Sequence, residues 1–166
     1  MKKILVVAVV FALAGAAQAA SVGFDFGTCF FKPSGAGGQT GNGSSFLINW
    51  NLENDLSLGV YAEQNPNVVL TVGAGTLTVS AIQVSKGVVK NVAVGLNLGS
   101  GAETLTVGPP IGSTASLVDI FGSVVILSGK GEKVEGTLKA TVAARFCNTV
   151  TNMDGVNLGL VVGIGF

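Results

Sequence analysis

Histidine is absent from the 166-residue sequence, and cysteine occurs only twice. General acid–base catalysis near neutral pH most often uses histidine, and zinc sites are built mainly from histidine and cysteine. Serines in predicted loops, such as Ser34, Ser44 and Ser113, therefore have no histidine to act as their base. Neither the phosphate-binding motif G-x-x-x-x-G-K-[ST] nor the dinucleotide-binding motif G-x-G-x-x-G occurs. We expect no enzymatic activity, no cofactor and no metal site.

Charged residues are also scarce. They make up 11% of the sequence, against about a quarter in ordinary soluble domains, whereas 48% of the residues are apolar. No block of basic residues favours binding to nucleic acid. After residue 20, no apolar run approaches the roughly 20 residues that a transmembrane helix needs, and the 25 glycines disfavour helices. The composition therefore predicts β structure with one face toward an apolar solvent.

The first residues have the pattern of a secretory signal peptide. Lys2 and Lys3 precede a short apolar run, and Ala17-Gln18-Ala19 has the small-x-small form of a cleavage site. The apolar run is too short to span a bilayer as a helix. We predict that residues 1–19 are a signal peptide cleaved after Ala19, and that residues 20–166 form the mature protein.

Apolar and polar or small side chains alternate with period two along most of the mature chain, which is the pattern of strands with two different faces. The phase changes near Ile82, so a β-bulge is possible there. Eight segments of this kind are predicted, at residues 22–31, 46–52, 56–63, 76–85, 91–98, 114–127, 132–147 and 156–166. Short connections of three or four residues alternate with long ones. The long connections are residues 32–44, 64–75, 99–113 and 148–155.

The last segment has an apolar stripe on one face and mostly glycine on the other. The stripe consists of Leu158, Leu160, Val162, Ile164 and Phe166. With the alternating loop lengths, this strand resembles those of the small transmembrane β-barrels of the bacterial outer membrane, which have short periplasmic turns and longer outer loops. The resemblance implies a closed antiparallel up-and-down barrel that lies in outer-membrane lipid as a monomer. It also implies that the stripe is the assembly signal recognised by the barrel-assembly machinery.

Closure of the barrel has a physical reason. Every backbone N–H and C=O in hydrocarbon must be paired within the protein, so the first segment must pair with the last. Two features depart from the family pattern. Trp50 and Tyr61 are the only tryptophan and tyrosine, so the usual aromatic girdles would have to come from Phe30, Phe31, Phe46 and Phe146. Residues 68–72 and 103–107 also have strand character inside long connections, which leaves ten strands as an alternative to eight.

Alternation places several charged residues in the barrel lumen. They are Asp25, Glu63, Glu135, Lys139 and Arg145. Because the interior of an eight-stranded barrel is just wide enough to be filled by side chains, and because an unpaired buried charge is costly, we predict that these residues form a compensating ionic plug. A path for protons or ions is the functional alternative.

The two cysteines, Cys29 and Cys147, both fall at the predicted outer ends of their strands with lumen-facing parity. Exported proteins meet an oxidising compartment, so a disulfide is predicted. The alternative is two separate buried thiols, because the eighth strand would lie between the first and the seventh.

Three functions follow from these patterns. The first is a non-enzymatic outer-membrane barrel with a role in envelope structure or surface contact. The second is an exported fimbrial or adhesin subunit with a β-sandwich fold, assembled by strand donation. The third is a lipid-modifying barrel enzyme, which the absence of histidine disfavours. A small pore is a variant of the first.

Overall fold

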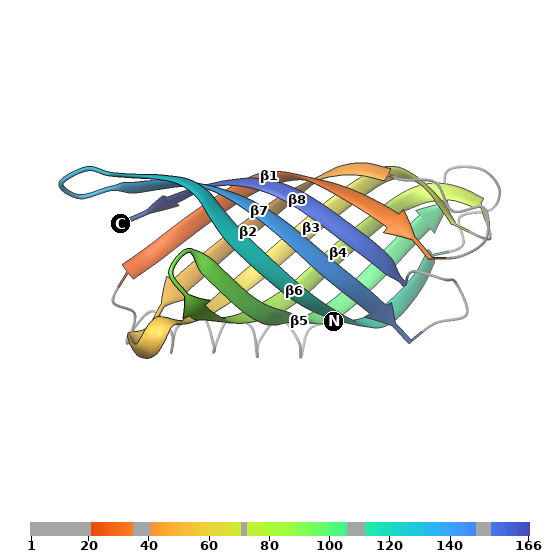
Figure 1. Cartoon of the computed structure of the whole chain (residues 1–166). Coiled ribbons are helices and arrows are strands. Elements are labelled where there is room, and N and C mark those ends of the chain that lie inside the picture. The colour runs from red at the N-terminus through yellow and green to blue at the C-terminus, as the bar shows by residue number, and fades with distance from the viewer. Residues whose placement is uncertain (1–20, 35–40, 71–72, 106–111, 149–153) are drawn as a thin grey trace.

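Eight antiparallel strands follow one another around a closed barrel (Figure 1). The computed structural model describes residues 21–34, 41–70, 73–105, 112–148 and 154–166, so the predicted signal peptide lies outside the described residues. The strands are β1 (Ser21–Pro33), β2 (Gly41–Asn51), β3 (Leu56–Leu70), β4 (Gly73–Val89), β5 (Val92–Leu105), β6 (Gly112–Lys130), β7 (Glu135–Cys147) and β8 (Gly155–Gly165). A 3₁₀ turn, η1 (Glu53–Asp55), joins β2 to β3. Among the described residues, no helix is long and apolar enough to cross a membrane.

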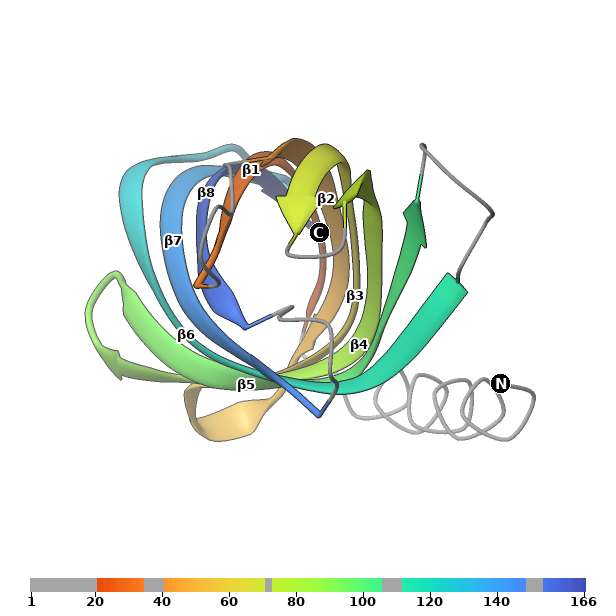
Figure 2. The ribbon, with the colours of Figure 1, turned by 90° about the vertical axis from the view of Figure 1, so that its right-hand side faces the viewer.

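The barrel closes between β1 and β8, as the backbone argument requires. These strands pair continuously from Gly23 opposite Gly165 to Pro33 opposite Gly155. Beyond the ladder, Phe166 and Val22 exchange two backbone hydrogen bonds, of 2.9 and 3.3 Å. The start of β1 and the end of β8 therefore lie at the end of the barrel that carries the short turns. Figure 2 looks along the barrel from the opposite end, where the long connections lie.

The described residues form eight strands and not ten. The described parts of the two ambiguous stretches, residues 68–70 and 103–105, simply continue β3 and β5. A closed barrel also excludes the fimbrial β-sandwich, because a sandwich consists of two separate sheets.

The bulge considered near Ile82 is not present. β4 keeps a continuous register with both neighbours from Leu77 to Lys86, and its shifts lie at its ends, near Gly75 and near Val89. The side chains of Leu77 and Val79 are fully buried inside the barrel, whereas Ile82 belongs to the outward face. Between Leu77 and Lys86, the inward face of β4 changes from apolar to polar while the register with both neighbours stays the same.

The change in polarity of the inward face of β4 accompanies an opposite change on its outward face. Near the long connections, outward residues such as Thr78, Ser80 and Ser116 are polar and exposed, as expected in water. The inward residues there form an apolar cluster of Phe31, Leu77, Val79, Ala115 and Leu117. This apolar layer makes the outer part of the barrel resemble a soluble protein, with the apolar side chains inside. Phe31, expected in an outer aromatic girdle, is one of these buried residues.

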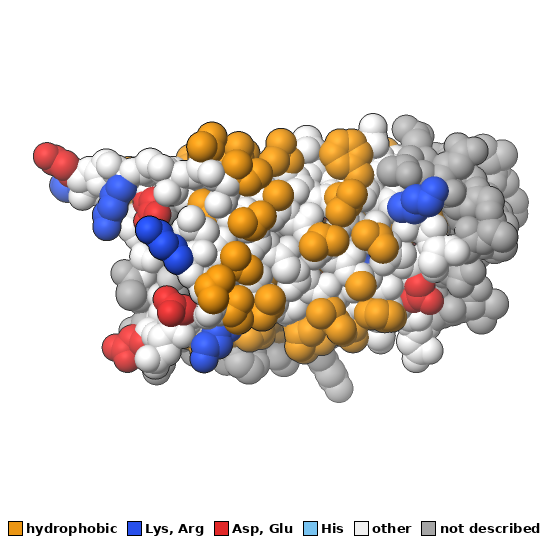
Figure 3. Space-filling view, in the orientation of Figure 1, with side chains coloured by type: hydrophobic (Ala, Val, Ile, Leu, Met, Phe, Trp, Pro, Cys, Tyr) orange, Lys and Arg blue, Asp and Glu red, His pale blue; other side chains and the backbone are white. Residues whose placement is uncertain are grey.

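The middle of the barrel has the opposite arrangement. Large apolar side chains form an exposed belt that runs across the molecule, and charged side chains gather mainly beyond the belt at the end of the short turns (Figure 3). The belt includes Phe26, Phe30, Val94, Leu96, Leu98, Val118, Ile120, Val124, Val142, Phe146, Val156, Leu158, Leu160, Val162 and Ile164. An exposed apolar surface of this extent indicates contact with lipid.

Inward-facing glycines provide space for large side chains on neighbouring strands. A Cβ atom at Gly155 would lie 2.8 Å from the ring of Phe31, and one at Gly95 would lie 2.7 Å from the ring of Phe121. A Cβ atom at Gly163 would overlap with Asp25. The inward glycines of β8 thus leave room in the lumen for the side chains of Phe31 and Asp25.

Trp50 provides a test of the outward face. It pairs with Val22 and Leu58 on neighbouring strands and shares the outward parity of Ile48. In vesicles that contain brominated lipids, we expect strong quenching of the fluorescence of Trp50, because its side chain faces outward. The signal can be assigned to this residue because it is the only tryptophan. The matched control is the double variant Trp50→Phe, Tyr61→Trp, which moves the indole to the inward face and should lose most of the quenching. Equal quenching of both proteins would contradict the assignment of faces.

Candidate functional site

A buried ionic cluster crosses the lumen. It lies between the apolar layer and the half of the barrel that carries the short turns, which is called the lower half below. Arg145 on β7 binds Glu63 on β3 through two hydrogen bonds, Nη1 to Oε1 at 2.9 Å and Nη2 to Oε2 at 2.8 Å. It also binds Asp119 on β6, Nε to Oδ1 at 2.9 Å and Nη2 to Oδ2 at 3.0 Å. The side chains of Arg145 and Glu63 have no exposed surface. Such bidentate, charge-assisted pairs are the strongest hydrogen bonds in proteins.

Neutral side chains complete the coordination of the two carboxylates. The Tyr61 hydroxyl donates to Glu63 Oε2 at 2.6 Å, Asn157 Nδ2 donates to the same atom at 2.7 Å, and Asn65 Nδ2 donates to Glu63 Oε1. Asn97 Nδ2 donates to Asp119 Oδ2 at 3.3 Å. These donors come from β3, β5 and β8, so the cluster holds strands from different sides of the barrel together. Supporting hydrogen bonds of this kind are what make a buried ion pair tolerable.

The lumen is closed on the side of the long connections. The ring of Phe31 lies over the Arg145 guanidinium, with 4.9 Å between the ring centroid and Cζ, a cation–π contact. The apolar layer of Phe31, Leu77, Val79, Ala115 and Leu117 lies beside the cluster on the outer side. Two successive layers, one ionic and one apolar, therefore fill this part of the interior.

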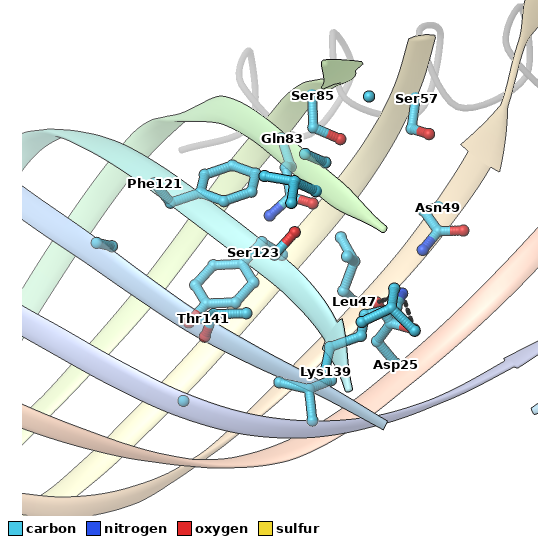
Figure 4. A pocket seen from close by; sticks show the side chains of 18 of the residues that line it. Asp25, Leu47, Asn49, Ser57, Gln83, Ser85, Phe121, Ser123, Lys139 and Thr141 are labelled. Carbon is cyan, nitrogen blue, oxygen red and sulfur yellow. Dashed lines mark hydrogen bonds and ion pairs between the residues drawn. The ribbon is translucent and has the colours of Figure 1, made fainter. Parts of the chain in front are cut away.

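The other half of the barrel contains a cavity of about 480 Å³ (Figure 4). Asp119, Asn97, Asn157 and Tyr61, which belong to the ionic cluster, form part of its wall. A second hollow of about 670 Å³ lies at the mouth, between Ser21, Lys130 and the end of β8. Because both hollows share the wall residues Asp25, Asn49, Asn51 and Lys139, the cavity opens toward the end of the short turns.

Comparisons with known proteins identify this architecture. No protein-family model and no curated protein matches the chain. Solved structures do match, and three of them follow. Neisserial surface protein A is 17% identical with a TM-score of 0.56, over 87% of this chain and 94% of the other. The N-terminal β-barrel domain of Pseudomonas aeruginosa OprF is 19% identical with a TM-score of 0.54, over 90% and 98%. The attachment invasion locus protein Ail of Yersinia pestis, in complex with the heparin analogue sucrose octasulfate, is 10% identical with a TM-score of 0.51, over 90% and 99%. The chain has the fold of the small eight-stranded outer-membrane β-barrels.

The charged residues predicted for the lumen of the barrel occupy three places. Glu63 and Arg145 belong to the buried cluster. Asp25 and Lys139 form a separate pair lower down, with Lys139 Nζ 3.0 and 2.8 Å from the two carboxylate oxygens. Glu135 is exposed at the start of β7, where it lines the mouth, so the expected single network is in fact two ionic groups and a rim residue.

Sequence reasoning missed Asp119. This residue lies between Val118 and Ile120, which are apolar and exposed on the outward face. Alternation would have placed Asp119 on the opposite face, which is the lumen, but nothing in the sequence pairs it with Arg145. The pairing depends on the register of β6 against β7, in which Asp119 lies directly opposite Arg145.

The predicted disulfide is not formed: both cysteines lie within the described residues, and no bond joins them. The reason is the closure of the barrel. β8 pairs with β1 on one side and with β7 on the other, and Cys29 lies opposite Gly159, which in turn lies opposite Thr141. Cys147 is six residues further along β7. The Cys29 thiol instead donates a hydrogen bond to Asn65 Oδ1 at 3.3 Å.

The apolar stripe of β8 lies on the outward face of the barrel. All five residues are exposed, namely Leu158, Leu160, Val162, Ile164 and Phe166. The Phe166 ring packs edge-on against Phe24 of β1, with 6.2 Å between centroids. The recognition of this stripe by assembly machinery stays a prediction. Among the described residues, no group of three or more histidine, cysteine or carboxylate side chains is arranged to hold a metal ion.

The buried cluster makes a quantitative prediction. Arg145→Ala leaves two buried carboxylates without their cation, so we expect a loss of about 3–5 kcal/mol in the free energy of unfolding, measured by urea titration in vesicles. The combined variant Arg145→Met, Glu63→Gln, Asp119→Asn removes all three charges and should cost less than the single change. Lys139→Ala, which breaks the less deeply buried pair with Asp25, serves as the control and should cost less, because the Lys139 side chain is still 22% exposed. A loss for Arg145→Ala no larger than for Lys139→Ala would contradict the role of the cluster.

Proposed function

We propose that this chain is a non-enzymatic, non-conducting integral protein of the bacterial outer membrane, with a role in envelope structure or surface contact. The observation that carries the proposal is the closed outer half of the lumen. The ionic cluster around Arg145 and the apolar layer that contains Phe31 both cross the interior. Side chains that fill the interior in two successive layers favour a barrel without the water-filled passage that a pore requires.

The orientation follows from the signal-peptide pattern and the loop lengths. We propose that residues 1–19 direct export and are removed, that the short turns face the periplasm and that the long connections face outward. The apolar belt would contact outer-membrane lipid, and we expect a monomer because the barrel closes on itself without a partner strand.

The sequence of the long connections favours uncharged contacts. Residues 32–44, 64–75, 99–113 and 148–155 contain a single basic residue, Lys32, and two acidic residues, Glu103 and Asp154. The similar protein Ail was solved with sucrose octasulfate, a polyanion of the kind that basic residues bind. This chain has no comparable set of basic residues in these connections, so we propose surface contacts that do not depend on positive charge.

The absence of conductance is the first test. In planar bilayers we expect no steady channel openings, because the two layers close the lumen. Arg145→Ala, with its cluster broken, should show flickering openings at most, since the apolar layer remains. Steady openings of the wild-type protein comparable with those of a general porin would overturn the proposal and favour the ion path.

The assembly role of the β8 stripe is the second test. Phe166→Ala removes the ring that packs on Phe24, and we expect less folded barrel in the outer membrane, measured by heat-modifiability of unboiled samples on gels. The matched control is Phe146→Ala on β7, since Phe146 is exposed to 54% and Phe166 to 62%. Equal assembly of both variants would show that the stripe is not the recognised signal.

A further inference from the structure

The cavity in the lower half of the barrel has features that neither closure nor anchoring requires. Its volume of about 480 Å³ falls within the range of roughly 300–1,000 Å³ that is typical of small-molecule sites. It is closed on one side by the ionic cluster and is open at the end of the short turns. A solute on that side of the membrane therefore has access to it.

The charged residues of the inner wall are already paired, and the two other charged residues of the lining, Asp55 and Lys90, are exposed in the turns at its rim. Lys139 binds both carboxylate oxygens of Asp25 at 3.0 and 2.8 Å, and Asp119 is held by Arg145. A charged solute would have to break one of these pairs or enter without a counterion, and both are costly. The wall therefore selects an uncharged ligand.

The remaining polar groups are amides and hydroxyls from several strands. They include Ser45, Asn49, Asn51, Gln83, Ser123, Thr141 and Asn157. Figure 4 shows Asn49, Gln83, Ser123 and Thr141 around the same space. Amides and hydroxyls each donate and accept hydrogen bonds, which suits a ligand with many hydroxyl groups of its own.

Two of these amides have unused hydrogen-bonding capacity. The Oδ1 atoms of Asn49 and Asn157 are buried and have no hydrogen-bond partner among the described residues. Asn49 is only 8% exposed and Asn157 only 6%. Buried polar atoms are nearly always paired, so both amides keep an unsatisfied acceptor next to the cavity, although neither Oδ1 atom is itself exposed to it.

Apolar surface lies among the polar groups. Leu47, Phe121, Ala143 and Val161 line the same cavity, and each is at least nine-tenths buried. The Phe121 ring is packed over Gly95, where a Cβ atom would lie 2.7 Å away, so its position is fixed. A ligand that combines hydroxyl groups with apolar C–H faces would contact both kinds of surface.

We propose that this cavity binds a neutral, polyhydroxylated solute of about one or two sugar rings. Entry from the periplasm depends on the orientation proposed above, but binding itself does not. The test therefore uses the full mature chain, folded in detergent micelles, where both ends are accessible. Failure of binding would leave the non-conducting barrel proposal unaffected.

The experiment is a titration with glucose and with N-acetylglucosamine, followed by saturation-transfer NMR. We expect saturable binding with a Kd on the order of 1 mM. Glycine betaine, a zwitterion, and hexanol, an apolar probe, should not compete. Binding of betaine or hexanol in preference to the sugars would overturn the proposed ligand class, and no saturable binding of any probe would show that the cavity holds only water.

A matched pair of variants locates the site. Ala143→Leu fills the cavity, whereas Ala144→Leu adds the same atoms on the exposed outer face of the same strand. We expect at least tenfold weaker sugar binding for Ala143→Leu and no change for Ala144→Leu. Equal affinities would place the sugar outside the barrel and overturn the proposal.

Thiol labelling provides a readout if Ala143→Leu does not fold. In a Cys29→Ser, Cys147→Ser background, Ser123→Cys places a thiol on the cavity wall and Ser116→Cys places one on the exposed outer surface. We expect saturating N-acetylglucosamine to slow labelling of Ser123→Cys by a methanethiosulfonate reagent at least fivefold, and not to slow labelling of Ser116→Cys. Unchanged labelling of Ser123→Cys would contradict the site.

Discussion

The ladder between β1 and β8 is the constraint on which the rest of the structure depends. Hydrocarbon offers no hydrogen-bond partner to a backbone N–H or C=O, so a strand in the membrane needs a neighbour on each side. The pairing of Gly23 with Gly165 through Pro33 with Gly155 gives the first and last strands their second neighbours. Closure in turn fixes a narrow interior, and it separates β1 from β7 by one strand. The unbridged cysteines and the glycines that face the lumen are both consequences of that single pairing.

The narrow interior explains how the lumen is filled. Inward positions hold either large side chains or glycines that make room for them, as Gly155 does for Phe31 and Gly95 does for Phe121. Within this space the polarity follows the solvent outside. Where the outer face is apolar, the interior is polar, and Arg145 lies between two carboxylates. Where the outer face is polar, the interior contains the apolar cluster, with Glu103 buried opposite Leu77. The result is a barrel that is closed on one side and hollow on the other.

Much of this fold is predictable from the sequence. The alternation along the chain and the alternating loop lengths indicate eight strands, and the terminal stripe of β8 indicates a lipid-facing surface. Prediction failed along β4: the apolar residues Leu77 and Val79 lie inside, and the apparent change of phase near Ile82 is a change in the polarity of the inward face. It also failed where a contact depends on register, as with Asp119 opposite Arg145. Alternation assigns a residue to a face, but only the pairing of neighbouring strands determines which inward side chains meet. The cavity has no sequence signal at all, since it arises from side chains on several strands.

The most direct test of the account is the removal of detergent from the purified mature protein. The exposed belt of apolar side chains requires an apolar solvent, so the account predicts that the protein aggregates or unfolds in plain buffer. It should keep its folded, heat-modifiable form only in micelles or lipid. A protein that stays monomeric and folded in buffer without detergent would contradict the membrane location of the belt, and with it the physical reason given for closure.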